Sequence, residues 1–261
     1  GVALVAGLST PPIQPAVRTI YPTIVNSRQL TPLFSLDASA QELIWVAGPV
    51  LATFVVTQIA TSAAILLCGI MLVIGGIWFI ARPAVGRVRT PRSKRNFGVV
   101  LKKPPVLLTT VVGFLLVGSC AAVEAGVVAV FGHDGPQAGI VLAIWSIGSL
   151  VGGLALGHVP ISPWSLARRM TLVFAGTALA IIMVDDFWWI SITLLISGIG
   201  LAPALAVIFA SVSSSVKFSD TAEAYGWVGT GQLIGAAIGS AIAGFLIDAN
   251  GAIGAFWAAA A

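Results

Sequence analysis

Long apolar runs separated by short polar segments dominate the chain, and the longest of them, residues 43–81, contains no charged residue. Coiled as one α-helix at about 1.5 Å per residue, this run would be nearly twice as long as the roughly 30 Å hydrocarbon core of a bilayer. The pattern therefore predicts two membrane spans with a turn between them. Polar residues suited to that turn are Thr57, Gln58, Thr61 and Ser62.

The same reasoning applied to the whole chain predicts eight spans and the start of a ninth, which begins at Ala252 and is cut off at Ala261. The centres of the eight predicted spans are residues 2–18, 43–56, 63–80, 106–130, 140–156, 171–184, 189–212 and 225–247. The predicted fold class is all-α: a polytopic bundle of membrane helices.

The distribution of charge is consistent with this number of spans. With spans that alternate in direction, all 13 Lys and Arg residues fall on one side of the membrane. The opposite side carries acidic residues, namely Asp134, Asp185, Asp186 and Asp248. Because loops rich in Lys and Arg remain in the cytoplasm, we predict that the basic side is cytoplasmic and that the chain is a multi-pass protein of the cell membrane.

Composition excludes a soluble globular domain. Only 8% of the residues are charged, 58% are hydrophobic, and the mean hydropathy is +1.04, whereas a soluble domain carries roughly 25% charged residues. Lipid is therefore the expected surrounding of most of the surface. The net charge of +4 is explained by membrane topology, so we predict no nucleic-acid partner.

The polar stretch 82–104 holds most of the basic residues and several prolines. Proline interrupts helices, and we interpret this stretch as a cytoplasmic linker between two helical bundles. Binding to nucleic acid or to anionic lipid is the alternative interpretation of such a basic run.

The pattern of reactive residues predicts neither an enzyme nor a bound cofactor. Cys68 and Cys120 lie inside apolar runs, where a thiol behaves as a small hydrophobic group, so no disulfide and no metal site is expected. His133 and His158 fall in predicted loops without companions at metal-ligand spacing. Without a glycine-rich phosphate loop or a nucleophile elbow, an ion gradient is the expected energy source.

Three segments resemble one known family. Residues 198–256 include the ending GFLID, a short loop with glycine, and then AF, and they resemble the tenth and eleventh spans of major facilitator superfamily transporters. Residues 41–52, QELIWVAGPVLA, are similar to the fifth span of exporters in that family, where a Gly-Pro pair marks the antiporter motif. The long basic stretch resembles the connection between the two six-helix halves of that fold.

The resemblance implies the domain organisation. Residues 1–81 would be the remainder of the N-terminal half, with spans four to six, and residues 82–104 the cytoplasmic linker. Residues 105–261 would be the C-terminal half, with spans seven to eleven and the start of span twelve. On this numbering the chain is a fragment that lacks the first three spans. The loop region 153–169 keeps Gly153, Gly157, Arg168 and Arg169 of a family motif but lacks its acidic residue.

Two glutamates are the leading candidates for a proton or substrate pathway. Glu124 lies deep in an apolar span, where a carboxylate is costly unless it is paired or faces a water-filled cavity; the alternative is a position near the outer boundary. Glu42 lies near the predicted start of its span, where it could interact with the helix dipole or with Arg18 or Arg28 in a cytoplasmic gate.

Other polar and flexible positions complete the predicted pathway. Gly48 and Pro49 are a predicted pivot, since proline kinks a helix and glycine admits a neighbouring backbone. Gln232 and Trp145 could meet substrate or could form contacts between helices.

A glycine stripe at Gly231, Gly235 and Gly239 predicts a close helix contact, and by the resemblance its partner would be the absent second span.

The resulting functional prediction is a proton-coupled exporter of small amphipathic molecules that works by alternating access. Its expected partners are a small-molecule substrate, a proton or other coupling ion, and membrane lipid. An importer or uniporter of the same fold and a non-transporting membrane sensor are the alternatives.

Overall fold

The computed structural model describes residues 13–83, 85, 98–132 and 136–261. Within them every regular element is helical and no strand occurs. The elements are α2 (Ile13–Ile24), α3 (Ser27–Gln58), α4 (Thr61–Ile80), η1 (Val99–Lys102), α6 (Pro104–Phe131), α7 (Gln137–Leu156), α8 (Ser165–Ala180), η2 (Ile181–Met183), α9 (Phe187–Ser215), α10 (Phe218–Asn250) and α11 (Ile253–Ala260).

Six of the described helices are long and apolar enough to cross a membrane: α4, α6, α7, α8 together with η2, α9 and α10. Each of them contains or closely matches a predicted span. The predicted turn after residue 56 is also confirmed, since α3 ends at Gln58 and α4 begins at Thr61. The structure is therefore the all-α bundle of membrane helices that the apolar pattern predicts.

The N-terminal helices differ from the prediction. The predicted span 2–18 lies mostly outside the described residues, and α2 continues past Arg18 to Ile24. α3 begins at Ser27, far before residue 43, because Asn26 caps it: the Asn26 side chain accepts a hydrogen bond from the Gln29 backbone N–H, and the Gln29 side chain accepts one from the Asn26 N–H. Hydrophobicity alone therefore underestimated the length of this helix.

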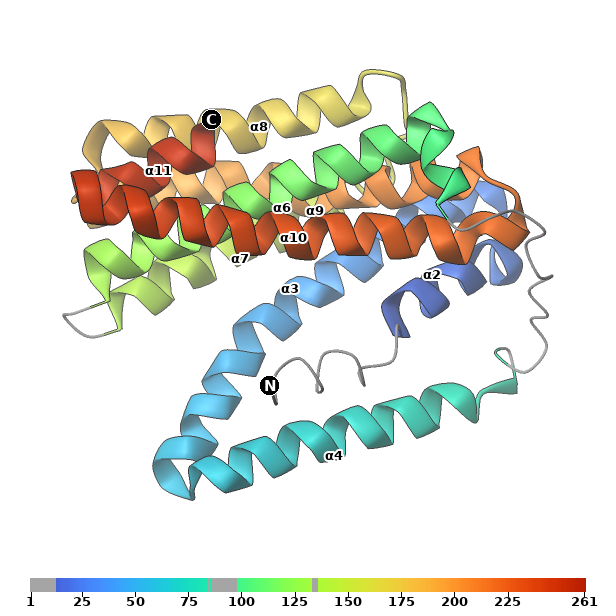
Figure 1. Cartoon of the computed structure of the whole chain (residues 1–261), viewed down its shortest axis with the longest axis horizontal. Helices are drawn as coiled ribbons and strands as arrows, with labels where there is room; N and C mark the ends of the chain where they lie inside the picture. Colours follow the sequence, from blue (N-terminus) through green and yellow to red (C-terminus); the bar gives the residue numbers. More distant parts are fainter. Residues whose placement is uncertain (1–12, 84, 86–97, 133–135) are drawn as a thin grey trace.

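Helices α6 to α11 form one packed bundle, in which α6 lies against α10 and α9 lies against α7 and α8 (Figure 1). α3 packs on α7 and α9 and then leaves the bundle, and α4 lies apart from it, in contact mainly with α3 (Figure 1). α4 exposes most of its large apolar side chains, including Ile65, Leu66 and Trp78. Such a surface is suited to lipid or to further helices.

Glycine allows the closest helix contacts in the bundle. A Cβ atom added to Gly235 or Gly239 of α10 would collide with the carbonyl oxygen of Phe114 or Gly118 of α6. The glycine stripe of α10 therefore faces α6, and the expectation that it would face an absent second span was wrong. On α7, Gly152 meets the Ile199 carbonyl oxygen of α9 in the same way, so each of the two main helix pairs has a glycine contact.

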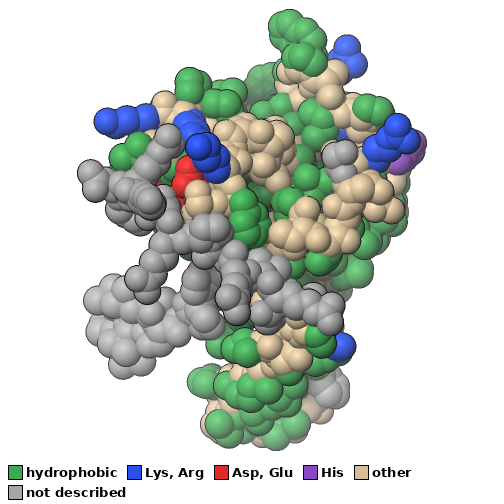
Figure 2. Space-filling model, turned by 90° about the vertical axis from the view of Figure 1, so that its right-hand side faces the viewer, with side chains coloured by type: hydrophobic (Ala, Val, Ile, Leu, Met, Phe, Trp, Pro, Cys, Tyr) green, Lys and Arg blue, Asp and Glu red, His purple; other side chains and the backbone are tan. Residues whose placement is uncertain are grey.

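The described Lys and Arg side chains gather at one end of the molecule. This end is formed by the starts of α3, α6, α8 and α10 and by the ends of α4, α7 and α9. Figure 2 views it and shows several Lys and Arg side chains with few acidic ones. We call it the basic end. Asp186, at the start of α9, and Asp248, near the end of α10, lie toward the other end, as the alternation of spans predicts.

Candidate functional site

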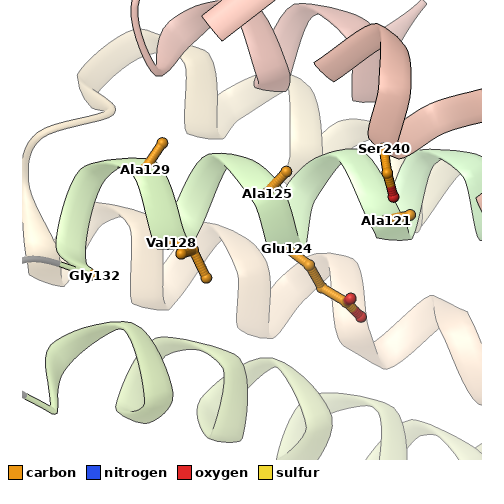
Figure 3. A pocket seen from close by; sticks show the side chains of 7 residues that line it. All are labelled: Ala121, Glu124, Ala125, Val128, Ala129, Gly132 and Ser240. Atoms are coloured by element: carbon orange, nitrogen blue, oxygen red, sulfur yellow. The ribbon is translucent and has the colours of Figure 1, made fainter. Parts of the chain in front are cut away.

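Glu124 lies on the wall of an open pocket. It is placed about two turns before the end of α6, and its side chain is exposed. The pocket has a volume of about 540 Å³, and its other lining residues are Ala121, Ala125, Val128, Ala129, Gly132 and Ser240. Figure 3 shows the Glu124 side chain leaving α6 away from Ser240, which comes from α10. The carboxylate therefore lies beside an open space with small and apolar walls that reaches Gly132 at the end of α6. Its role in a proton or substrate pathway stays a prediction.

Glu42 lies in the middle of α3 and is only 8% exposed. Its side chain forms a hydrogen bond with Ser149 of α7, and it is close enough to Glu124 for their charges to interact. Cys120 of α6 is also close enough to both carboxylates for their charges to act on its thiol. The structure thus brings the two predicted glutamates together, although they come from helices far apart in the sequence.

The predicted interaction of Glu42 with a helix N-terminus was wrong. α3 begins at Ser27, so Glu42 is about four turns inside the helix, beyond the reach of the dipole at its start. The structure also shows no ion pair between Glu42 and Arg18. Arg18 instead pairs with Asp37, with 2.9 Å between Arg18 Nε and Asp37 Oδ2, and Arg28 is exposed at the start of α3.

Ser149 was missed by the sequence analysis because a serine among small and apolar residues looks like a packing position. Its hydroxyl accepts a hydrogen bond of 3.1 Å from the Ala202 backbone N–H of α9 and also bonds to Glu42 of α3. It therefore links three helices. Trp145 lies one turn away on the same helix and is buried, and its indole Nε1 has no hydrogen-bond partner among the described residues.

Gln232 is not part of the pocket. It is half-buried on α10, and its Cγ lies 3.3 Å from where a Cβ on Gly113 of α6 would stand. This contact agrees with a role between helices. Ser240, about two turns further along α10, reaches the pocket in its place.

The predicted pivot at Gly48 and Pro49 falls within a continuous helix. α3 runs through both positions; the side chain of Pro49 lies outside the described residues. Among the described residues, nothing lies within 4 Å of a Cβ added to Gly48, so no neighbouring backbone from that part of the chain approaches there, contrary to expectation. A bend at this position remains a prediction.

Gly153 and Gly157 of the family-like loop region let α3 approach the end of α7. The Ser35 hydroxyl donates a hydrogen bond of 2.5 Å to the Gly153 carbonyl oxygen. A Cβ on Gly157 would stand 2.5 Å from Ser35 Oγ, and one on Gly153 would collide with Ser39 Oγ. These contacts hold the first part of α3 tightly against α7 near the basic end.

Arg169 of the same region ties α8 to its neighbours. Its Nη1 donates a hydrogen bond of 2.7 Å to the Pro203 carbonyl oxygen of α9, and its Nη2 donates a longer one of 3.5 Å to the Leu156 carbonyl oxygen of α7. Within the part of the chain that the structure describes, its hydrogen-bond partners are carbonyl groups, and no acidic side chain pairs with this arginine there. Arg168, by contrast, is exposed.

The remaining reactive groups are dispersed. Cys68 is exposed and Cys120 is half-buried, and both are free thiols. Over the described residues, no group of three or more His, Cys, Asp and Glu side chains is placed to hold a metal ion.

Apolar helices that run between two ends of opposite charge define a polytopic membrane protein. The Major Facilitator Superfamily profile matches residues 1–184 and again residues 121–261, so that the matches together cover the chain. The chain belongs to the Major Facilitator Superfamily and is a multi-pass membrane transporter protein. A comparison with curated proteins found no match.

Proposed function

We propose that this protein is a proton-coupled exporter of small amphipathic molecules that works by alternating access in the cell membrane. The observation that carries the proposal is the electrostatic interaction of Glu124 with Glu42 beside an open pocket. Two carboxylates whose negative charges repel each other in a largely apolar surrounding favour the binding of a proton by one of them. Such a pair can therefore bind a proton on one side of the membrane and release it on the other.

The position of the two glutamates supports coupling to a conformational change. Glu42 belongs to α3, and Glu124 belongs to α6. In the proposed domain organisation, residues 1–81 are part of the first half, 82–104 the linker, and 105–261 the second half. The distance between the two carboxylates then changes whenever one half rocks against the other, as transporters with a central site do. Their affinity for a proton changes with that distance.

The pocket supports an amphipathic substrate. Small and apolar residues line it around one carboxylate, with the Ser240 hydroxyl at its edge. An apolar wall accepts the hydrophobic part of a ligand, and Glu124 would hold a cationic or hydrogen-bonding group. Export is the proposed direction because residues 41–52 resemble the exporter motif.

The proposal is tested by proton flux into liposomes that contain the intact protein, challenged with lipophilic cations and with neutral amphipathic compounds. The expected result is proton movement that depends on the substrate and is abolished by Glu124→Gln, at unchanged abundance in the membrane. Asp248→Asn is the matched control, because Asp248 is exposed near the end of α10 and does not line the pocket.

Coupled transport that survives in Glu124→Gln would contradict the role of this carboxylate. Substrate movement without protons would show uniport, and accumulation in vesicles of defined orientation separates import from export. The absence of any flux across the panel would favour a non-transporting sensor.

A further inference from the structure

Arg18 is the centre of a second polar cluster, separate from the glutamate pair. Its Nε lies 2.9 Å from Asp37 Oδ2. Asp37 also accepts a hydrogen bond of 3.0 Å from the Tyr21 hydroxyl and a longer one, 3.3 Å, from the Gln41 amide. All four residues come from α2 and α3. The ion pair is therefore contained within the N-terminal helices and does not need α9 or α10 to form.

The flat face of the same guanidinium group contacts α9, which is outside the N-terminal helices. Arg18 Cζ lies 3.6 Å from the centre of the Phe209 ring of α9, within the range of a cation–π interaction. Arg18 is only 5% exposed, and its Nη2 has no hydrogen-bond partner among the described residues. A buried cation without full hydrogen bonding depends strongly on the ring that covers it.

Other aromatic rings complete the contact. Phe34 of α3 is fully buried, and its ring centre lies 6.2 Å from those of Phe209 and Tyr225. The Tyr225 hydroxyl of α10 donates a hydrogen bond of 3.0 Å to the Phe209 carbonyl oxygen, which fixes Tyr225 and Phe209 to each other. We call Arg18, Phe34, Phe209 and Tyr225 the aromatic latch.

The latch joins α2 and α3 to α9 and α10, and it does so at the basic end only. It involves α2, the first part of α3, the last part of α9 and the first part of α10, which meet there. Toward the other end, α3 leaves the bundle and α4 lies apart (Figure 1). Opening the basic end requires α2 and α3 to separate from α9 and α10, and that movement must pull Arg18 off Phe209.

We infer that the cation–π contact between Arg18 and Phe209 holds the basic end closed and that its breakage gates access to the central site from that side. Arg18 keeps Asp37 as a partner in the open state, so opening exposes an ion pair to water and leaves no isolated buried charge. Opening then costs the aromatic contacts of the latch together with the contacts that Ser35 and Ser39 of α3 make with the end of α7. This inference rests on the proposed alternating access, but its test does not require transport.

The test measures the distance between two spin labels at the basic end. The labels are placed at Arg28→Cys and Ser214→Cys, both exposed positions, at the start of α3 and the end of α9. Cys68 and Cys120 are first replaced by Ala, so that only the introduced thiols react. The closed basic end gives a short distance between the labels and the open one a long distance. With the latch unaltered, the short distance should predominate.

Phe209→Leu keeps an apolar side chain and the Arg18 ion pair but removes the ring, and Arg18→Gln removes the cation. Each is expected to shift the ratio of short to long distances by roughly tenfold, as the loss of a desolvated cation–π contact implies. Arg18→Lys should give a smaller shift, because a lysine keeps the charge and loses the planar face.

Arg82→Gln is the matched control. Arg82 Cζ lies 4.6 Å from the Trp78 ring, so the same kind of contact is lost near the end of α4, outside the latch. Unchanged distances in Phe209→Leu would overturn the inference, and this variant decides the question if Arg18→Gln does not fold. Shifted distances without any transport would retain the latch and reject only the proposed transport function.

Discussion

A single hydroxyl group positions the more deeply buried of the two glutamates. Ser149 bonds to Glu42 of α3 while it accepts the Ala202 N–H of α9. Glu42 is 8% exposed, and a buried carboxylate needs such partners to remain in an apolar surrounding. The geometry of the proposed proton site therefore depends on a residue of α7 that itself carries no charge.

We expect Ser149→Ala to destabilise the protein and to weaken coupling. Loss of the hydroxyl removes one hydrogen-bond partner from the Glu42 carboxylate and one from the Ala202 backbone N–H. Such a loss at buried groups lowers the free energy of unfolding by about 1–3 kcal/mol. The measurement is the melting temperature in detergent, followed by proton flux in liposomes. Ser146→Ala, on the same helix at a less buried position, serves as the control. Equal stability and flux in the two variants would argue against a role of Ser149 in holding Glu42.

At the scale of the elements, backbone contact between helices shapes the bundle. α6 and α10 approach closely because Gly235 and Gly239 present no side chain to the α6 carbonyl groups. In a bilayer, where lipid is as apolar as the side chains, such close packing is a main source of helix association. The pocket of Glu124 lies along this same helix pair, since its wall includes Ser240 of α10.

Gly235→Ala is expected to push α10 away from α6. The added methyl group would collide with the Phe114 carbonyl oxygen, and overpacking of this kind costs about 1–3 kcal/mol. Thermal unfolding in detergent measures the loss.

Gly229→Ala is the matched control on the same helix, because nothing lies within 4 Å of its added Cβ. It should be neutral or stabilising by up to about 1 kcal/mol, since alanine favours a helix. A similar loss in both variants would show that the effect arises from the helix itself and not from its contact with α6.

At the scale of the whole molecule, charge sets the orientation in the membrane. The described basic residues gather at one end (Figure 2), and Asp186 and Asp248 lie toward the other. Short loops rich in Lys and Arg are retained in the cytoplasm. The latch at Arg18 would then lie on the cytoplasmic side, and the splayed end of α3 would face outward.

This orientation predicts opposite labelling of two exposed positions. In a protein with Cys68 and Cys120 replaced by Ala, a membrane-impermeant maleimide added to intact cells should label Asp248→Cys and not Arg168→Cys. Inverted membrane vesicles should give the reverse pattern. Labelling of Arg168→Cys in intact cells would show that the basic end faces outward.

Several features could be predicted from local sequence because their causes are local. The turn between α3 and α4 follows from the length of an apolar run, and Glu124 stands out because it is charged within such a run. The length of α3 could have been predicted better from the cap at Asn26 and Gln29, a local signal that hydrophobicity obscured. The placement of Glu42 within its helix was wrong for that reason.

The local pattern of the sequence is enough to predict the membrane surroundings, the helical class and the positions of the six described spans, because the length of an apolar run and the sidedness of basic residues act on each segment independently. Which helices meet became visible only in the folded molecule. The pairing of Glu42 with Ser149 and its closeness to Glu124, the contact of Gly235 with α6, and the stacking of Arg18 on Phe209 all join residues far apart in the chain. Such partners are selected by packing and by the burial of charge in three dimensions, and neither leaves a periodic signal along the sequence.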